Sequence, residues 1–120
     1  MSQWLEKNNC IMSGFVIHHY NIVDRSRVGE LGPLSLPIVE KYGGTILIAS
    51  PLKALKGSTY SNMVVYQFDS FDAALTFYHS NEMTDFAKLR DQIIDGISMV
   101  LPGHSETDQV VSSGYFSTGD

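Results

Sequence analysis

The 120-residue chain is poor in cysteine and in positive charge, and it has no long hydrophobic run. Its single cysteine, Cys10, excludes an internal disulfide, and no basic cluster stands near it to activate the thiol. Eight Lys and Arg residues against 13 Asp and Glu residues give a net charge of −5. Because nucleic-acid sites concentrate positive charge on one face, we expect no nucleic-acid partner. No stretch approaches the ~20 apolar residues that span a bilayer, so we expect no membrane partner.

The composition is typical of one globular domain, with 43% hydrophobic and 18% charged residues. The N-terminal residues lack the continuous apolar region and the cleavage site of a secretion signal, so we expect a cytoplasmic protein. Residues 1–12 are polar and unpatterned, which predicts a flexible extension. Residues 13–104 form the predicted domain, and residues 105–120 a polar C-terminal tail.

Four segments rich in β-branched, aromatic or other apolar side chains predict strands, and they are residues 14–20, 45–49, 63–68 and 97–101. The second segment is apolar on both faces, which is typical of a sheet covered on both sides. The loop between the second and third strands is long, and loops of this kind often border sites.

Two helical regions separate these strands. Residues 26–42 carry apolar side chains at helical spacing, but Pro33 and Pro37 interrupt them, which predicts a kinked or two-piece helix. Gly43 is placed to end this helix in a left-handed conformation. Ser70 is placed as the N-cap of the second helical region, which pauses at residues 80–81 and then resumes.

The order of strands and helices predicts an α+β fold, with a four-stranded antiparallel sheet and both helices on one face. The opposite face then needs a cover, and a second copy of the chain is the simplest one. Two sheets packed in this way form a closed, barrel-like homodimer. The alternative is a monomer whose own tails shield the open face.

Several short motifs together carry a family resemblance. They are Gly14-Phe15-Val16-Ile17, Asp24, Glu40-Lys41-Tyr42-Gly43-Gly44, Gly57, Phe68-Asp69-Ser70, Ala73-Ala74, Phe77-Tyr78-His79-Ser80-Asn81-Glu82, Arg90 and Gly103. On these motifs the chain resembles the family called domain of unknown function 1330, within the dimeric α+β barrel superfamily. The resemblance implies a ferredoxin-like βαββαβ fold and a dimer, but no settled reaction. Superfamily relatives include cofactor-free monooxygenases, haem-degrading enzymes and small-ligand sensors.

The chain departs from the family pattern at positions that could carry chemistry. Acidic residues are usual where this chain has His19 and Gln67, and Phe77 and Met83 replace the usual Trp and Tyr. We therefore do not expect an acid–base mechanism that uses those carboxylates.

His18 and His19 are the first candidates for chemistry, because histidine titrates near neutrality and binds metals. Adjacent strand residues point to opposite faces, so the pair cannot readily hold one ion. The alignment places His19 on the barrel face with Phe15 and Ile17, as a candidate catalytic proton acceptor or a hydrogen-bonded core residue. With one cysteine and four dispersed histidines there is no zinc spacing, and we expect no metal and no cofactor.

Four residues are candidates for substrate binding. Arg90 fits either a solvated face with local ion pairs or, from the family match, a clamp for a ligand carboxylate. Asn81 fits either a helix cap or a ligand contact. Tyr66 and Gln67 alternate along one strand, so at most one of them lines a given pocket.

Two classes of function remain open at this stage. In the first, a cofactor-independent enzyme acts on a small apolar or carboxylated metabolite, with His19 as the proton acceptor and Arg90 holding the substrate. In the second, the protein is a non-catalytic ligand-binding or interaction dimer. A pKa of His19 near neutrality, together with an open cavity beside it, would favour the enzyme.

Overall fold

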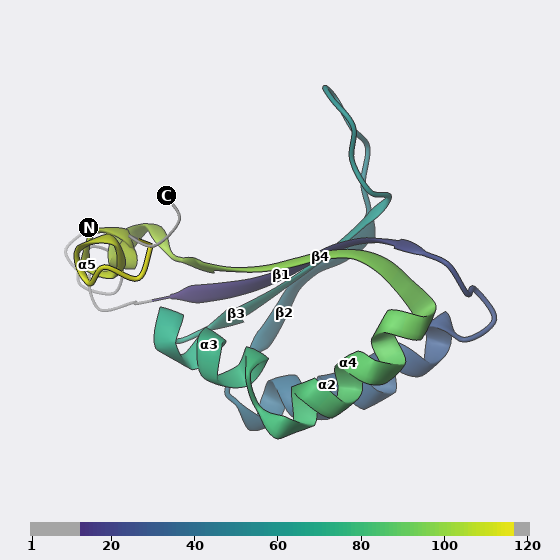
Figure 1. Ribbon diagram of the computed structural model, residues 1–120, viewed down its shortest axis with the longest axis horizontal. Coiled ribbons are helices and arrows are strands. Elements are labelled where there is room, and N and C mark those ends of the chain that lie inside the picture. The colour runs from purple at the N-terminus through teal and green to yellow at the C-terminus, as the bar shows by residue number, and fades with distance from the viewer. Residues whose placement is uncertain (1–12, 117–120) are drawn as a thin grey trace, which may run out of the picture.

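The computed structural model describes residues 13–116, so the predicted N-terminal extension lies outside the described residues. Four strands form one antiparallel sheet in the order β2-β3-β1-β4 (Figure 1). The strands are β1 (Gly14–Ile22), β2 (Thr45–Pro51), β3 (Asn62–Phe68) and β4 (Ile94–Pro102). The predicted α+β class is therefore confirmed.

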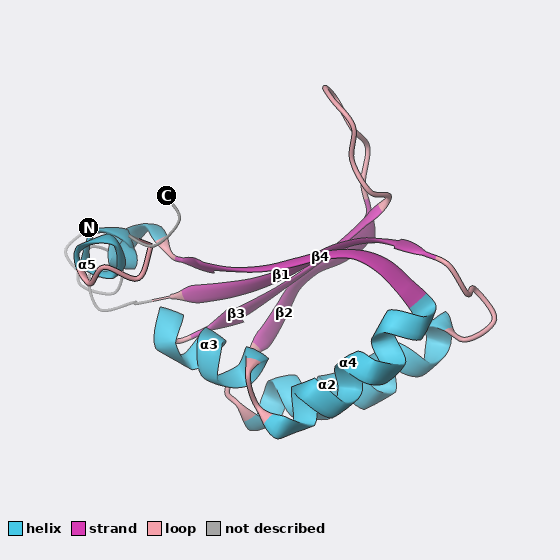
Figure 2. Cartoon of the chain, viewed as in Figure 1, coloured by secondary structure: helices cyan, strands magenta, loops and turns pink. Residues whose placement is uncertain are grey.

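The main helices form a second layer on one face of the sheet (Figure 2). They are α2 (Leu31–Lys41), which follows the short 3-10 helix η1 (Val28–Glu30), α3 (Phe71–Tyr78) and α4 (Asn81–Ile93). None of the helices in residues 13–116 is long and apolar enough to cross a bilayer.

The first helical region is in two pieces, η1 and α2, as expected, but the division at Leu31 comes before both prolines. Pro33 lies in the first turn of α2, where its missing N–H removes no intrahelical bond, and Pro37 lies inside the helix. Gly43 closes the helix at φ 80°, and its N–H donates to the carbonyl of Glu40 at 3.0 Å. The N–H of Gly44 donates to the carbonyl of Val39 at 2.8 Å. These two bonds form a Schellman motif, so the predicted glycine end is confirmed.

Serine caps start both later helices. The Ser70 hydroxyl accepts the N–H of Ala73 at 3.0 Å, and the Ser80 hydroxyl accepts the N–H of Met83 at 3.2 Å. Each bond satisfies one of the free N–H groups in a first helical turn. The predicted pause near residue 80 is therefore the junction between α3 and α4.

The hydrophobic core fills the space between the layers at one end of the strands. Val16, Phe68, Ala74 and Phe77 are almost fully buried there, and the rings of Phe68 and Phe77 lie 4.7 Å apart. In the sheet register, Val16 pairs with Tyr66 and His18 with Val64. The side chains of His18 and Tyr20 therefore lie further along β1 from this core.

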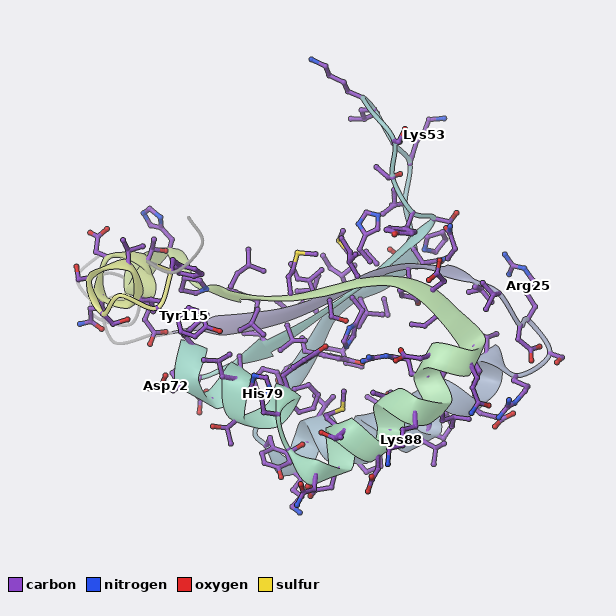
Figure 3. The ribbon with its side chains drawn as sticks, viewed as in Figure 1. Arg25, Lys53, Asp72, His79, Lys88 and Tyr115 are labelled. Carbon is purple, nitrogen blue, oxygen red and sulfur yellow. The ribbon has the colours of Figure 1, made fainter. Side chains whose placement is uncertain are left out.

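The opposite face of the sheet is uncovered by any helix in the described part of the chain (Figure 1). Large apolar side chains are exposed along it: Leu47 (50%), Ile48 (46%), Ile97 (50%) and Leu101 (38%). A register shift between Ile46 and Ile48 makes Leu47 the extra residue of β2. Residues 13–116 therefore cover only one of the two faces of β2. The connection between β2 and β3, which carries Lys53, projects away from the helices (Figure 3).

The C-terminal segment has structure that the polar composition did not predict. It forms the 3-10 helix η2 (His104–Glu106) and the six-residue helix α5 (Thr107–Ser112). The buried carboxylate of Glu106 accepts the N–H of Phe71 at 3.0 Å, and the Tyr115 ring lies 5.0 Å from the Phe71 ring. The segment is thereby attached to the start of α3. Six residues are too few for helical periodicity to stand out in a sequence. The domain boundaries proposed from the sequence stay predictions.

Candidate functional site

Two adjoining cavities lie between the sheet and the helices, beyond the hydrophobic core. They have volumes of about 210 and 230 Å³ and share four residues, His18, Tyr20, Arg90 and Ile94. The shared residues come from β1, α4 and β4.

The two cavities differ in chemical character. The first, here called the apolar chamber, is lined mostly by carbon atoms from α2, β2, β3 and α4, including Leu31, Ile46, Val64 and Phe86. The second, here called the polar chamber, lies toward β4 and is lined by Tyr78, Asp91, Gly96, Ile97 and Ser98 besides the shared residues. The shared residues therefore border an apolar space and a polar one.

His18 is buried at this border, with only 5% of its surface exposed. Its Nδ1 atom forms a hydrogen bond with the Ser98 hydroxyl at 2.7 Å, and its ring makes an edge contact with Tyr66 at 5.7 Å. Its Nε2 atom has no hydrogen-bond partner among residues 13–116. A buried polar atom without a partner is uncommon, because burial removes its hydrogen bonds to water.

The environment keeps His18 uncharged. Burial in the protein interior, with a smaller contribution from the positive charge of Arg90, lowers the pKa of His18 from 6.5 to about 3. The ring is therefore neutral at physiological pH, with one nitrogen carrying a proton and the other a lone pair.

Arg90 brings a permanent positive charge to the same place. Only 8% of the residue is exposed, so it does not lie on a solvated face. Its Nε–H donates to the carboxylate of Asp91 at 3.2 Å, but that carboxylate side chain is 69% exposed. The Nη1 atom is buried and has no partner in the described chain. Because a guanidinium does not lose its proton, this group presents a fixed cationic donor.

Two tyrosines, Tyr20 and Tyr66, also line the apolar chamber. Burial raises the pKa of Tyr20 and that of Tyr66, in Tyr66 against the opposing effect of a hydrogen bond with Ser35. Both phenols therefore stay protonated at neutral pH. Across the two chambers the described residues supply one cation, one neutral imidazole, the phenols of Tyr20, Tyr66 and Tyr78, the Asp91 carboxylate that pairs with Arg90, and the hydroxyls of Ser35 and Ser98.

The structure brings together two of the residues proposed from the sequence, Tyr66 and Arg90, in the apolar chamber. Gln67 pairs with Phe15 on the other face of the sheet, where its amide nitrogen donates to the Ser13 hydroxyl at 3.2 Å. Asn81 is exposed in the first turn of α4, and the helix cap is Ser80 and not Asn81.

His19 also lies on the open face of the sheet, as the alternation predicts. Its Nε2 atom accepts the backbone N–H of Tyr60 at 2.8 Å, and it lines an open hollow of about 370 Å³ beneath the β2–β3 connection. His19 and Arg90 are on opposite sides of the sheet, so they cannot contact one ligand within one chain. The role of His19 as a proton acceptor stays a prediction.

Sequence reasoning gave His18 too little weight. The signal was present, because His18 lies two residues after Val16 and Tyr66 two residues before Phe68, and alternation along a strand places each on the same face as its buried neighbour. The sequence did not show that α4 packs on the helix-facing side of the sheet, where Arg90 and His18 line the same cavities. In the part of the chain that the structure describes, no group of three His, Cys, Asp or Glu residues could hold a metal ion.

Comparison with solved structures shows the same fold at low sequence identity. A protein of unknown function from Rhodopseudomonas palustris has a TM-score of 0.59 and 13% identity, over 85% of this chain and 88% of that chain. A conserved protein from Methanosarcina mazei Go1 has a TM-score of 0.51 and 9% identity, over 81% and 96%. SnoaB, a cofactor-independent oxygenase from Streptomyces nogalater, has a TM-score of 0.50 and 8% identity, over 78% and 93%.

A search of curated proteins found no match to this chain. A family profile does match, and it covers residues 13–104, which is most of the sequence. The match agrees with the ferredoxin-like topology of the sheet and its helices. The chain therefore belongs to the family described as Domain of unknown function (DUF1330).

Proposed function

We propose that the protein binds a small, largely apolar molecule with one anionic group in the cavities between the sheet and the helices. The observation that carries this proposal is the buried Nη1 atom of Arg90, which has no partner among the described residues. A guanidinium binds a carboxylate with two parallel hydrogen bonds, and such bonds are strong because both groups are charged. A ligand carboxylate would satisfy this atom.

The size of the apolar chamber supports a small ligand. Its volume is about 210 Å³. An apolar cavity of ~150 Å³ accommodates benzene, whereas sites for drug-sized molecules are ~300–1,000 Å³. One aromatic ring, or an aliphatic group of similar size, fits this space.

The protonation states favour binding over acid–base turnover in the free protein. General acid–base catalysis is most efficient when the pKa of the catalytic group lies near the working pH. Here the pKa of His18 is far below neutrality, and burial raises the pKa of Tyr20 and that of Tyr66. We therefore place ligand binding first.

A cofactor-independent oxygenase is the second candidate, favoured by the similarity in fold to SnoaB. An anionic ligand beside Arg90 would raise the pKa of His18, because negative charge stabilises the imidazolium. His18 would then become a base only in the complex. An oxygenase would consume oxygen when a phenolic acid is bound, whereas a protein that only binds the acid would not. Measuring oxygen uptake therefore distinguishes the two candidates.

Calorimetric titration of the full chain with phenylacetate, and with the uncharged phenylacetamide, tests the binding proposal. We expect phenylacetate to bind at least tenfold more tightly than the amide, and Arg90→Gln to remove that difference. Lys88→Gln is the matched control, because Lys88 loses the same charge on the outer, exposed side of α4 (Figure 3). Equal affinity for the acid and the amide, or no effect of Arg90→Gln, would reject the carboxylate site.

We further propose that a second copy of the chain covers the open face of the sheet. The exposed side chains of Ile48, Ile97 and Leu101 form an apolar surface that water would otherwise contact. Sedimentation analysis should give a dimer, and Ile97→Lys should give a monomer. Val111→Lys, at an equally exposed residue of α5, should leave the dimer intact. A monomeric wild-type chain at all concentrations would reject this assembly.

A further inference from the structure

At the border between the two chambers, two buried polar atoms, not one, lack a partner in the part of the chain that the structure describes. Besides Nη1 of Arg90, Nε2 of His18 is buried without a hydrogen-bond partner among residues 13–116. Both residues are more than nine-tenths buried, and both line the apolar and the polar chamber. A ligand that satisfies the imidazole atom as well as the guanidinium would gain a hydrogen bond that a ligand of the guanidinium alone does not make.

The kind of group that His18 requires depends on its tautomer. Nδ1 forms the bond with the Ser98 hydroxyl, which can act as donor or as acceptor. An N–H at Nε2 would add a second donor beside the fixed positive charge of Arg90. We therefore assign the proton to Nδ1, which donates to Ser98, and the lone pair to Nε2. The site then offers one cationic donor and one neutral acceptor.

We propose that the ligand is a 2-hydroxy acid with an apolar body of about one ring. Its carboxylate accepts hydrogen bonds from Arg90, and the hydroxyl on the adjacent carbon donates to Nε2 of His18. The apolar body occupies the apolar chamber, and the head group lies at the boundary with the polar chamber. This inference rests on the proposed function, because it specifies the ligand of the same site.

Four acids of similar size test this proposal by calorimetric titration of the full chain. Mandelate carries the 2-hydroxyl, phenylacetate lacks it, 2-methoxy-2-phenylacetate (the methyl ether of mandelate) blocks it, and phenylglyoxylate replaces it with a carbonyl. We expect one enantiomer of mandelate to bind about tenfold more tightly than phenylacetate, which corresponds to ~1.4 kcal/mol. The methoxy and keto acids should show no such gain, since neither can donate a hydrogen bond.

A variant at His18 provides an independent test. In His18→Asn the side-chain amide nitrogen can replace Nδ1 as the donor to Ser98, while the acceptor at the Nε2 position is removed. We expect mandelate and phenylacetate to bind this variant within about twofold of one another. His104→Asn, at an exposed residue, is the matched control and should keep the tenfold preference. Comparison of the four acids on the wild-type chain decides the question if His18→Asn does not fold.

The failures of the two proposals are distinguishable. If phenylacetate binds in an Arg90-dependent way but mandelate gains nothing, the 2-hydroxy acid is rejected and the carboxylate site stands. Tighter binding of phenylglyoxylate than of mandelate also rejects it, because a donor at Nε2 would then be present. If none of the four acids binds, both proposals are rejected.

Discussion

The burial of His18 predicts a marked loss of stability in mild acid. Its pKa is about 3 in the folded chain and near 6.5 when the ring is exposed to water. Below pH 6.5 the unfolded chain therefore binds a proton that the folded chain does not. Stability contributed by this group is complete above pH 6.5 and is lost as the pH falls from 6.5 toward 3.

The size of this effect follows from the two pKa values. Each pH unit between them lowers the free energy of unfolding by ~1.4 kcal/mol, so lowering the pH from 7.5 to 5 removes ~2 kcal/mol. Most exposed carboxylates titrate below this range, which leaves the effect of His18 separable.

Urea unfolding followed by circular dichroism measures this quantity at a fixed protein concentration. The difference in unfolding free energy between pH 7.5 and pH 5 should be ~2 kcal/mol smaller in His18→Asn than in the wild type. The control His104→Asn should retain the wild-type difference. If His18→Asn keeps the full dependence on pH, then His18 is not the buried neutral group described above.

Three further predictions concern the fold. Gly96→Ala should destabilise the protein by ~2 kcal/mol or more in thermal unfolding, because its new Cβ would lie 2.1 Å from a backbone oxygen of β1. Gly29→Ala, which meets nothing within 4 Å, should not destabilise it, and equal melting temperatures for the two variants would contradict this account. Ser80→Ala should cost ~1 kcal/mol through the lost cap of α4, and unchanged urea unfolding would show that the cap is dispensable. Glu106→Ala should expose the C-terminal segment to proteases, because the bond to the N–H of Phe71 is lost, whereas an unchanged cleavage rate would mean that other contacts hold the segment.

Local signals in the sequence were sufficient to predict the order of elements. Ser70 and Ser80 are short polar residues before helical runs, and Gly43 follows the last turn of α2. Each acts on its immediate neighbours, so each is visible in a short window of sequence. The C-terminal helix was missed because it is held by a distant contact, between Glu106 and the start of α3.

The candidate site was only partly predictable, because alternation along a strand separates two faces without showing which face holds a cavity. The sequence correctly separated His18 from His19 and Tyr66 from Gln67. It did not show that α4 places Arg90 on the side of His18 and Tyr66. It also could not show that the Ser98 hydroxyl, 80 residues away, bonds one ring nitrogen of His18, while the other has no partner in the described part of the chain. Contacts of this kind depend on how helices pack on the sheet.

The most direct test of the proposed site is nuclear magnetic resonance of the histidine side-chain nitrogens during titration with phenylacetate. His18 and His19 are adjacent in sequence but lie on opposite faces of the sheet, so each reports on one possible site. A ligand between the sheet and the helices should shift the ring resonances of His18 and leave those of His19 unchanged. Shifts at His19 with none at His18 would contradict the proposed site and move it to the open face.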